Sequence, residues 1–260
     1  MIRSLWIAKT GLDVQQTHLD VISNNLANGT TAGYKRVKPM FEDLIYQTIR
    51  QAGGPTQGDA QSPTGLQIGA GARVAATERI HIQGALNQTQ NPLDLAIYGN
   101  GFFQINLPDG SVAYTRDGNF TRSASGEIVT QIGFTVAPGI TIPGEATSIN
   151  VAQTGEVTYT VQGNPTPIQA GQLQLATFSN PAGLTSIGQN LFLETAASGN
   201  PQQGAPGANG IGQLRQYFVE ASNVNLAEEL VSMIVAQRAY EINTRAISAS
   251  DDMLQRLGQM

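Results

Sequence analysis

The chain has 260 residues, and only 13% of them are charged, against roughly 25% in an average soluble domain. Its formal net charge is −5 and it has no cysteine, which argues against nucleic acid as a partner and excludes disulfides, thiolate metal sites and a cysteine nucleophile. Low charge, with 29 glycines and 12 prolines, favours turns and extended surfaces that pack against a neighbour.

The first segment of the chain carries an apolar residue at every seventh position. This stripe consists of Leu5, Leu12, Leu19 and Leu26, and Ile22 lies near the same face. Because a seven-residue repeat keeps one side of a helix facing a partner helix, the pattern predicts a helix over residues 2–27, within an N-terminal segment of residues 1–30. Its partner is either the other terminal helix or copies of itself. The ordinary alternative, a helix packed on its own domain's core, fits such a narrow stripe less well.

An Asn-rich segment ends this predicted helix. Asn28 and Gly29 readily take the left-handed conformation found after helix C-termini. Asn24 and Asn25 offer side-chain amides to backbone groups left unpaired at the helix end. A short basic cluster follows, which we interpret as a solvated turn: Lys35, Arg36 and Lys38.

The sequence predicts an extended linker over residues 31–67. Residues 51–66 are the most polar part of this linker. This part has almost no large apolar side chain and is too polar to bury itself. We expect it to be flexible in isolation or held in place by neighbours in an assembly. The residues that mark it are Gly53, Gly54, Pro55, Pro63 and Gly65.

Residues 68–222 predict a β domain. Apolar and polar residues alternate over residues 93–97 and 103–107, and Gly-, Asn- and Asp-rich turns recur at short spacing. Short strands separated by frequent turns are typical of a β-barrel or sandwich-like domain.

Residues 223–260 predict a second long helix with the same seven-residue spacing. Asn225 is a favourable N-cap, and Glu228 stands in a capping-box relation to it. At ~1.5 Å per residue this helix is on the order of 50 Å long and needs a partner beside it. Its apolar stripe at seven-residue spacing consists of Leu226, Met233, Tyr240, Ile247 and Leu254, and we include Leu230 with it in the expected seam.

Together these elements predict an α+β fold. The two terminal helices pair as a coiled-coil-like inner domain, and extended segments connect them to one central β-rich, barrel- or sandwich-like domain. Polar residues beside the C-terminal stripe make a self-sufficient two-helix coiled coil unfavourable, so we expect the helices to depend on other subunits: Gln237, Thr244 and Asp251.

The sequence shows no constellation of residues that indicates catalysis. The two histidines, His18 and His81, stand alone, and isolated histidines are more often packing or surface residues than metal ligands. We expect no catalytic site, no metal and no cofactor. The N-terminus does not have the pattern of a secretory signal, because Lys9, Asp13 and His18 interrupt any apolar core. No stretch approaches the roughly 18 apolar residues of a membrane span, so we expect no direct membrane insertion.

Several segments resemble the bacterial flagellar rod and hook proteins, an axial protein family. Residues 93–103, 114–118, 222–231 and 237–243 carry part of the resemblance, which covers essentially the whole chain. Within the family, the length, the single β domain and the polar stretch at 51–66 are most similar to those of distal rod subunits. The motif after the first helix consists of Asn24, Asn25, Leu26, Ala27, Asn28, Thr31, Gly33, Tyr34 and Lys35.

The resemblance implies a structural role. Subunits of the family stack into a helical hollow tube, the paired terminal helices line an export channel, and the tube transmits torque from the motor to the hook. The implied partners are other copies of the chain, proximal rod proteins on one side and hook protein on the other, the surrounding periplasmic and outer-membrane rings, and the flagellar type III export apparatus. Export without a cleaved signal peptide and a location in the rod that crosses the periplasm are implied as well. The helix stripes are then the expected assembly seam, and residues 51–66 the expected determinant of stiffness.

Two alternatives remain at this point. The nearer one is another axial protein, a proximal rod or hook subunit. The other belongs to a different class, a secreted β-rich adhesin or cell-wall hydrolase. That class would need an export signal or a cluster of polar catalytic residues, and the sequence indicates neither.

Overall fold

The structure is a computed structural model that describes residues 2–52, 55–57, 60–61, 63–208 and 210–258. The chain divides into two compact units. The terminal unit contains Met1–Ala27, Val37–Glu78 and Asn225–Met260, and the β unit contains Asn28–Arg36 and Arg79–Val224. The chain therefore crosses between the units four times, after residues 27, 36, 78 and 224.

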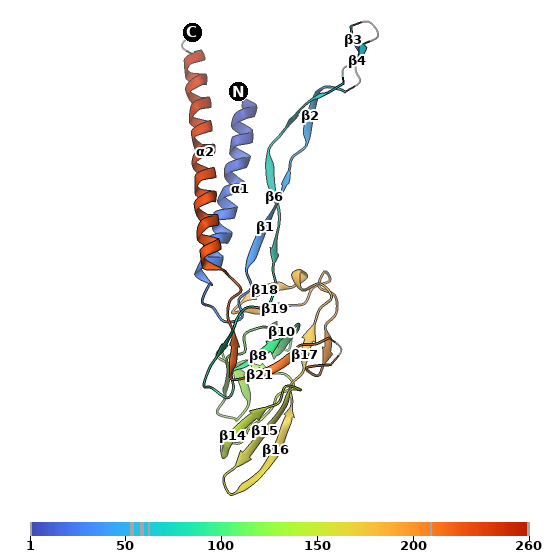
Figure 1. The fold of residues 1–260 in the computed structure, drawn as a ribbon, viewed down its shortest axis with the longest axis vertical. Helices are drawn as coiled ribbons and strands as arrows, with labels where there is room; N and C mark the ends of the chain where they lie inside the picture. Colours follow the sequence, from blue (N-terminus) through green and yellow to red (C-terminus); the bar gives the residue numbers. More distant parts are fainter. Residues whose placement is uncertain (1, 53–54, 58–59, 62, 209, 259–260) are drawn as a thin grey trace. The chain divides into compact units, whose positions relative to one another are not determined.

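Two long helices form the core of the terminal unit. Helix α1 (Ile2–Ala27) and helix α2 (Leu226–Gly258) lie side by side (Figure 1). Gly11 allows a close approach, because a Cβ atom there would lie 3.0 Å from the Asn243 side-chain nitrogen. The predicted pairing of the terminal helices is confirmed. No helix among the described residues is long and apolar enough to cross a bilayer.

A two-stranded antiparallel ribbon completes the terminal unit (Figure 1). Strand β1 (Val37–Asp43) pairs with β6 (Ala72–Arg79), and β2 (Tyr46–Arg50) pairs with β5 (Leu66–Gly69). The sequence predicted an extended linker over residues 31–67, and much of this segment is extended as strands of the ribbon. Pairing needs only backbone donors and acceptors, so a polar sequence without an apolar pattern can still form it. Its outermost strands are β3 (Pro55–Gln57) and β4 (Ala60–Gln61).

The main sheet of the β unit has nine strands. Seven of them follow one hydrogen-bonded path, β11-β12-β13-β9-β10-β19-β18, and β17 joins β9 to β20. The strands are β9 (Phe102–Asn106), β10 (Val112–Thr115), β11 (Phe120–Arg122), β12 (Ile128–Thr130), β13 (Thr135–Val136), β17 (Leu175–Thr177), β18 (Thr185–Gly188), β19 (Leu191–Leu193) and β20 (Gln202–Gly204).

Smaller sheets lie beside it, and the sheets do not close into a barrel. The predicted α+β fold with a central β-rich domain is confirmed, and of the barrel- and sandwich-like arrangements left open, a closed barrel is not formed, since alternating short strands do not specify how sheet edges meet. A short 3-10 helix, Pro181–Gly183, precedes β18. The smaller sheets comprise β14 (Ala146–Val151), β15 (Glu156–Val161) and β16 (Asn164–Gln172), then β8 (Leu95–Tyr98) with β21 (Gln213–Gln216), and β7 (Leu86–Gln88) with β22 (Phe218–Glu220).

The β unit has a well-packed apolar core. Phe103 and Phe120 are almost fully buried and meet edge to face at 5.0 Å between ring centroids. A second cluster, on Phe102, Phe178 and Phe192, contains further edge-to-face ring pairs. Such packing contributes both transfer free energy and specific ring geometry, so this unit has what a self-supporting domain needs.

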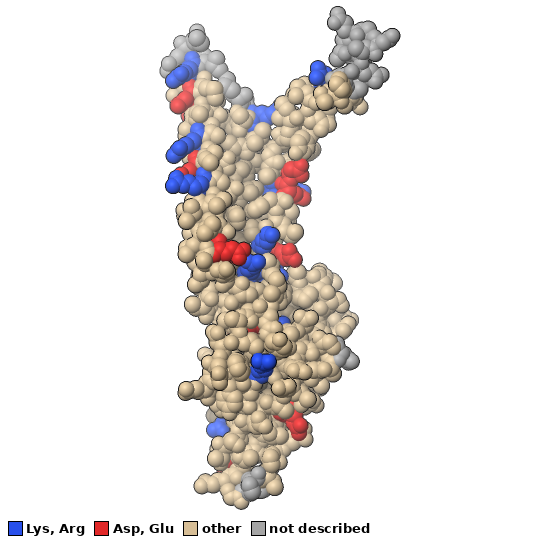
Figure 2. Space-filling model, in the orientation of Figure 1, with Lys and Arg blue, Asp and Glu red and all other residues tan. Residues whose placement is uncertain are grey.

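Charged side chains are sparse on the surface. In the face shown in Figure 2, most of the surface is neither Lys or Arg nor Asp or Glu, as expected from a chain with 13% charged residues. A surface of this kind favours contact with other proteins more than a highly charged, solvated surface does.

Candidate functional site

Helix α2 leaves many of its large apolar residues exposed. Its most buried residues are Glu229, Ala236 and Ser250, which are small or polar and lie at multiples of seven residues. The same inward stripe also contains the half-buried apolar residues Met233, Ile247 and Leu254, so it is less apolar than a coiled-coil seam but not wholly polar. In a single chain α2 therefore presents an apolar face with no cover. The large exposed residues of this face are Leu226, Leu230, Val231, Ile234, Val235, Tyr240, Ile242 and Met253.

The predicted stripes divide between buried and exposed positions. On α2, Met233, Ile247 and Leu254 are half-buried, whereas Leu226, Leu230 and Tyr240 are exposed. On α1, Ile22 is buried, and the four leucines of the stripe are only half-buried: Leu5, Leu12, Leu19 and Leu26. Both stripes thus keep apolar area that the contacts within one chain leave accessible.

Asn225 caps helix α2 from the position that the sequence predicts. Its side-chain oxygen accepts hydrogen bonds from the backbone N–H groups of Ala227 at 3.1 Å and Glu228 at 3.4 Å. Because the first N–H groups of a helix have no partner inside it, these bonds fix where α2 begins.

The Asn-rich motif joins the two helices to the ribbon. Asn25 is buried, and its side-chain amide exchanges two hydrogen bonds with the backbone of Val37, at 2.8 and 2.9 Å. The same amide nitrogen donates to Glu229 of α2 at 3.4 Å. One asparagine thus connects α1, β1 and α2 inside the terminal unit. Asn24 and Ala27 are exposed, and Asn28 and Thr31 form a local turn through a hydrogen bond between their side chains at 3.2 Å.

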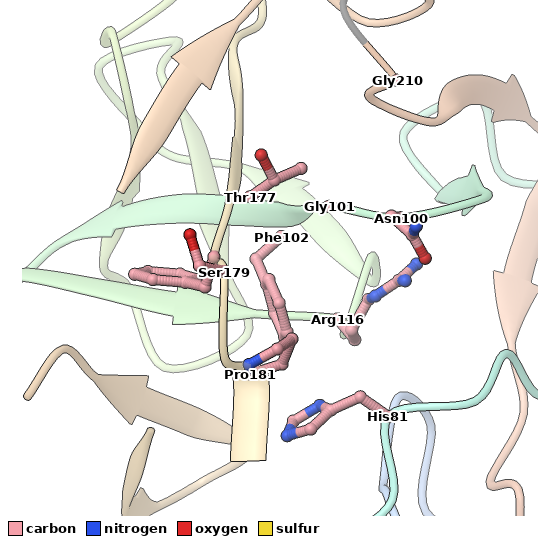
Figure 3. Close-up of a pocket in the computed structure, with 10 residues that line it drawn as sticks. His81, Asn100, Gly101, Phe102, Arg116, Thr177, Ser179, Pro181 and Gly210 are labelled. Carbon is pink, nitrogen blue, oxygen red and sulfur yellow. The ribbon is translucent and has the colours of Figure 1, made fainter. Parts of the chain in front are cut away.

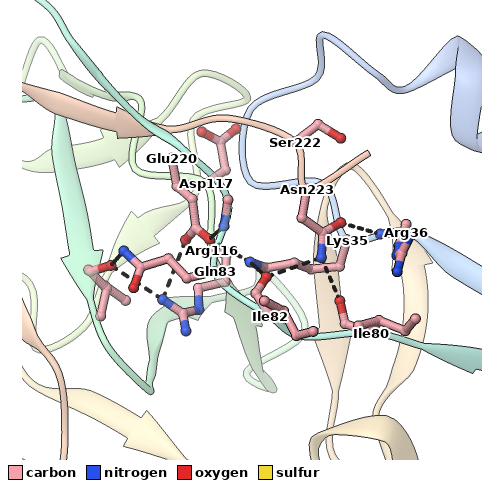
Figure 4. Close-up of polar contacts among 12 residues, drawn as sticks. Lys35, Arg36, Ile80, Ile82, Gln83, Arg116, Asp117, Glu220, Ser222 and Asn223 are labelled. Atoms are coloured by element: carbon pink, nitrogen blue, oxygen red, sulfur yellow. Dashed lines mark hydrogen bonds and ion pairs between the residues drawn. The ribbon is translucent and has the colours of Figure 1, made fainter. Parts of the chain in front are cut away.

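The motif ends at a group of three buried charged residues in the β unit, which we call the charge cluster (Figure 4). Lys35 and Arg116 both reach the carboxylate of Glu220, at 2.5 Å from Lys35 Nζ and 3.4 Å from Arg116, and all three side chains are at most 3% exposed. Burial lowers the pKa of Lys35 and of Arg116, and Glu220 opposes both shifts. The interpretation of Lys35 as part of a solvated turn was wrong, because its partner lies 185 positions along the chain.

Gly33 and Tyr34 are buried just before the cluster. Gly33 has a φ of +68°, and a Cβ atom there would lie 2.6 Å from the backbone nitrogen of Asp117. Both the positive φ and the close approach exclude larger residues at this position.

A cleft of about 370 Å³ lies next to the cluster in the β unit (Figure 3). Its lining includes His81, Arg116, Phe102 and Pro181. His81 packs edge to face on Phe102 and Phe192 at 5.4 and 5.6 Å, and its ring nitrogens are shielded from solvent. Burial, with the charges of Lys35, Arg79 and Arg116, lowers its pKa to about 3. Among the described residues no group of three His, Cys, Asp or Glu side chains could hold a metal ion.

The predicted stiffness segment lies at the far end of the ribbon. Gly53 and Gly54 fall outside the described residues. Pro55 begins β3, Pro63 lies in a bend, and Gly65 leaves no space for a side chain, since a Cβ atom there would lie 2.8 Å from the Arg50 carbonyl oxygen.

Three family descriptions match the chain. "Flagella basal body rod protein" matches residues 5–35, "Flagellar hook protein FlgE/F/G D1 domain" matches residues 96–159, and "Flagellar basal body rod FlgEFG protein C-terminal" matches residues 215–260. The matches fall in both units.

Whole-chain relatives agree with these descriptions. The flagellar basal-body rod protein FlgG of Buchnera aphidicola subsp. Acyrthosiphon pisum is 55% identical over 100% of both chains. The proteins of the same name from Borreliella burgdorferi and Bacillus subtilis are 49% and 40% identical, over at least 97% of each chain. The chain belongs to the flagellar basal-body rod protein family.

The charge cluster spans all three matched segments of this rod-family chain. Lys35 lies in the first, Arg116 in the second and Glu220 in the third. Sequence reasoning singled out Lys35 as a motif residue but missed Glu220 and Arg116 as its partners. For Glu220 the available signal was a charged residue at the end of the short apolar run Phe218–Glu220, whereas Arg116, followed by Asp117 and Gly118, looked like part of a turn.

Proposed function

We propose that the chain is a structural, non-catalytic subunit of the distal flagellar rod that assembles with copies of itself into a helical hollow tube. Family membership supports the rod assignment. The observation that carries the mode of assembly is the uncovered apolar face of α2, on which Ile234, Val235 and Ile242 are 57%, 62% and 65% exposed. A soluble monomer gains nothing from such a face, whereas a neighbouring subunit would bury it.

Polymerisation of the purified full chain tests this proposal. Leu230→Ser and Ile234→Ser each remove apolar area from the face of α2, and we expect both to raise the concentration needed for polymers to form. Ile132→Ser is the matched control, because Ile132 is also about half exposed but lies in the β unit. If all three variants polymerised like the unmodified chain, the apolar face of α2 would not be the seam.

A position in the distal rod implies which proteins the chain contacts. We propose contacts with proximal rod proteins at one end of the tube, with hook protein at the other, and with the rings around it, after passage through the flagellar export apparatus without a cleaved signal peptide. Cross-linking from introduced cysteines in isolated basal bodies would identify the neighbours. Neighbours drawn only from the hook would contradict the distal rod position and favour a hook subunit.

We further propose that residues 51–66 set the stiffness of the rod by bridging neighbouring subunits. The support is the ribbon, which carries these residues to the end of a long pair of strands. Deleting residues 51–66 should leave assembly intact and yield bent or softer rods in electron micrographs. Straight rods from the deleted chain would contradict the proposal.

We also propose that the ends of the chain become fully ordered only on assembly. The mainly polar or small contact stripe of α2 supports this, since it contributes little apolar burial within one chain. Limited proteolysis of the monomer should cleave before residue 30 and after residue 225. A monomer resistant at both ends would rule the idea out.

A further inference from the structure

The cleft beside the charge cluster has the size of a small-ligand site. Its volume of about 370 Å³ lies within the roughly 300–1,000 Å³ that is usual for such pockets. Every residue that lines it belongs to the β unit, so its shape is defined within that unit. The proposed rod assembly uses helix α2 and leaves this cleft without a role.

Arg116 brings to the cleft a donor for which the described protein groups offer no acceptor. The side chain is only 3% exposed, and Figure 3 shows it extending toward Asn100. Its Nη2 donates to the Gly99 carbonyl oxygen at 2.7 Å, and its Nη1 reaches Glu220 at 3.4 Å. Its Nε is buried and has no hydrogen-bond partner among the described residues. Because an unsatisfied buried donor is costly, and more so on a charged group, this N–H favours an acceptor that enters the cleft.

The groups around the cleft carry an excess of positive charge. The charges of Lys35, Arg79 and Arg116 all act on the imidazole of His81, which lines the cleft. Glu220 pairs with Lys35 and Arg116, whereas Arg79 forms no ion pair with any described residue. An incoming group with negative charge is therefore favoured over a neutral or positive one.

Aromatic rings and hydroxyl groups form other parts of the lining. Phe102 and Phe178 pack edge to face at 5.8 Å between ring centroids, and the guanidinium of Arg116 lies 5.5 Å from the ring centroid of Phe102. Thr177 and Ser179 add hydroxyl groups to the same lining. Apolar walls with a few polar groups are typical of sites for organic ligands, since the walls hold the body and the polar groups orient one end. An inorganic anion would use the donor and gain nothing from the rings.

We propose that the cleft binds a small organic carboxylate, whose oxygen accepts the Arg116 Nε–H while its apolar body lies against Phe102 and Phe178. A carboxylate fits the donor because hydrogen bonds between charged groups are roughly twice as strong as those between neutral ones. Arginine is also the cation whose planar N–H groups match a carboxylate best. The site is independent of rod assembly, because all of its parts lie in the β unit of one chain.

Titration of the full-length monomer with sodium benzoate, followed by ¹H–¹⁵N NMR, tests the proposal. Benzoate carries one carboxylate on an aromatic ring, and the assigned Arg116 Nε–H signal reports directly on its acceptor. We expect a saturable shift of this signal with a Kd on the order of millimolar, as suits so small a ligand. Acetate lacks the ring, benzamide lacks the charge and inorganic phosphate lacks the apolar body, so each should bind about tenfold more weakly or worse.

A variant that fills the cleft gives a second test. Ser179 lines the cleft and is exposed, so Ser179→Phe should raise the Kd for benzoate about tenfold or more without disturbing the core. Ser186→Phe is the matched control, because Ser186 is exposed in β18 and does not line the cleft. Near-ultraviolet circular dichroism checks that both variants are folded.

Three results would overturn the proposal. They are the absence of a saturable shift of the Arg116 Nε–H signal with benzoate, equal binding of benzoate by Ser179→Phe and the unmodified chain, and binding of benzamide or phosphate as tight as that of benzoate. If Ser179→Phe does not fold, the comparison of the four probes on the unmodified chain decides alone. The titration measures no assembly, so its outcome is separate from that of the polymerisation experiment.

Discussion

The two units of this chain differ in how many large apolar side chains they bury. The β unit encloses aromatic and aliphatic residues such as Phe103 and Phe120, and it satisfies its buried charges with one another. In the terminal unit, α2 turns Glu229, Ala236 and Ser250 inward and leaves Ile234 and its apolar neighbours exposed. The β unit thus has the core of a domain that is stable alone, whereas the exposed apolar residues of α2 are the ones that the proposed assembly would cover.

Lowering the pH should produce the largest difference in stability between the two units. The pKa of His81 is lowered to about 3 in the folded β unit, so between pH 6.5 and 3 the unfolded chain binds a proton that the folded chain does not. Stability is therefore highest above pH 6.5 and falls as the pH falls toward 3, by about 5 kcal/mol for this one group. Urea unfolding at several pH values, followed by near-ultraviolet circular dichroism, measures this. His81→Phe keeps the ring packing and should flatten the pH dependence in that window; an unchanged dependence would mean that other groups produce it.

Removing the buried carboxylate should have the next largest effect. Glu220→Gln leaves Lys35 and Arg116 buried without an anion and should lower the free energy of unfolding of the β unit by about 3–5 kcal/mol. The matched control is Glu241→Gln, which breaks the exposed pair between Arg238 and Glu241 on α2 and should change stability by less than about 1 kcal/mol. Equal losses of stability in Glu220→Gln and Glu241→Gln would contradict the difference between the two units.

A pair of apolar truncations compares the two units directly. Phe103→Ala opens a cavity in the β core and should cost about 3–5 kcal/mol in urea unfolding of the monomer. Ile242→Ser changes an exposed residue of α2 and should stay within about 0.5 kcal/mol in the same measurement. A large loss from Ile242→Ser would show that α2 is already covered in the monomer.

The smallest effect concerns the start of α2. Asn225→Ala removes the cap and should cost about 1 kcal/mol of helix stability. Trp6 is the only tryptophan and lies on α1, so its fluorescence reports unfolding of the terminal unit. The urea midpoint seen by Trp6 should fall, while the midpoint of the β unit stays unchanged; movement of both midpoints would show that the units unfold together.

The features that could be predicted from the sequence are those that depend on patterns among neighbouring residues. Both helices, the cap at Asn225 and the β character of the middle follow from periodicity and turn residues, which act over a few neighbouring positions. The resemblance to the axial proteins gave the family and the rod role. The same local patterns could not tell which face of α2 turns inward, because a stripe records apolarity and not the partner that covers it.

Long-range partners remained hidden for a related reason. Lys35 and Glu220 are far apart along the chain, and each alone looks like a surface residue. The sequence predicted the ribbon segment as extended but not which residues pair, because backbone pairing leaves no side-chain signature in a polar segment. A buried ion pair becomes predictable only once the topology that brings its strands together is known.

The outward apolar face of α2 has a thermodynamic consequence. In the assembly proposed above, the free energy of covering this face is released only when another subunit binds, so it enters the stability of the terminal helices as a mass-action term. Below the threshold for association the helices have only their mainly polar or small contact stripe, and above it each added subunit stabilises those already in place. The melting temperature of the terminal unit is then expected to rise with the concentration of the chain, while that of the β unit stays constant.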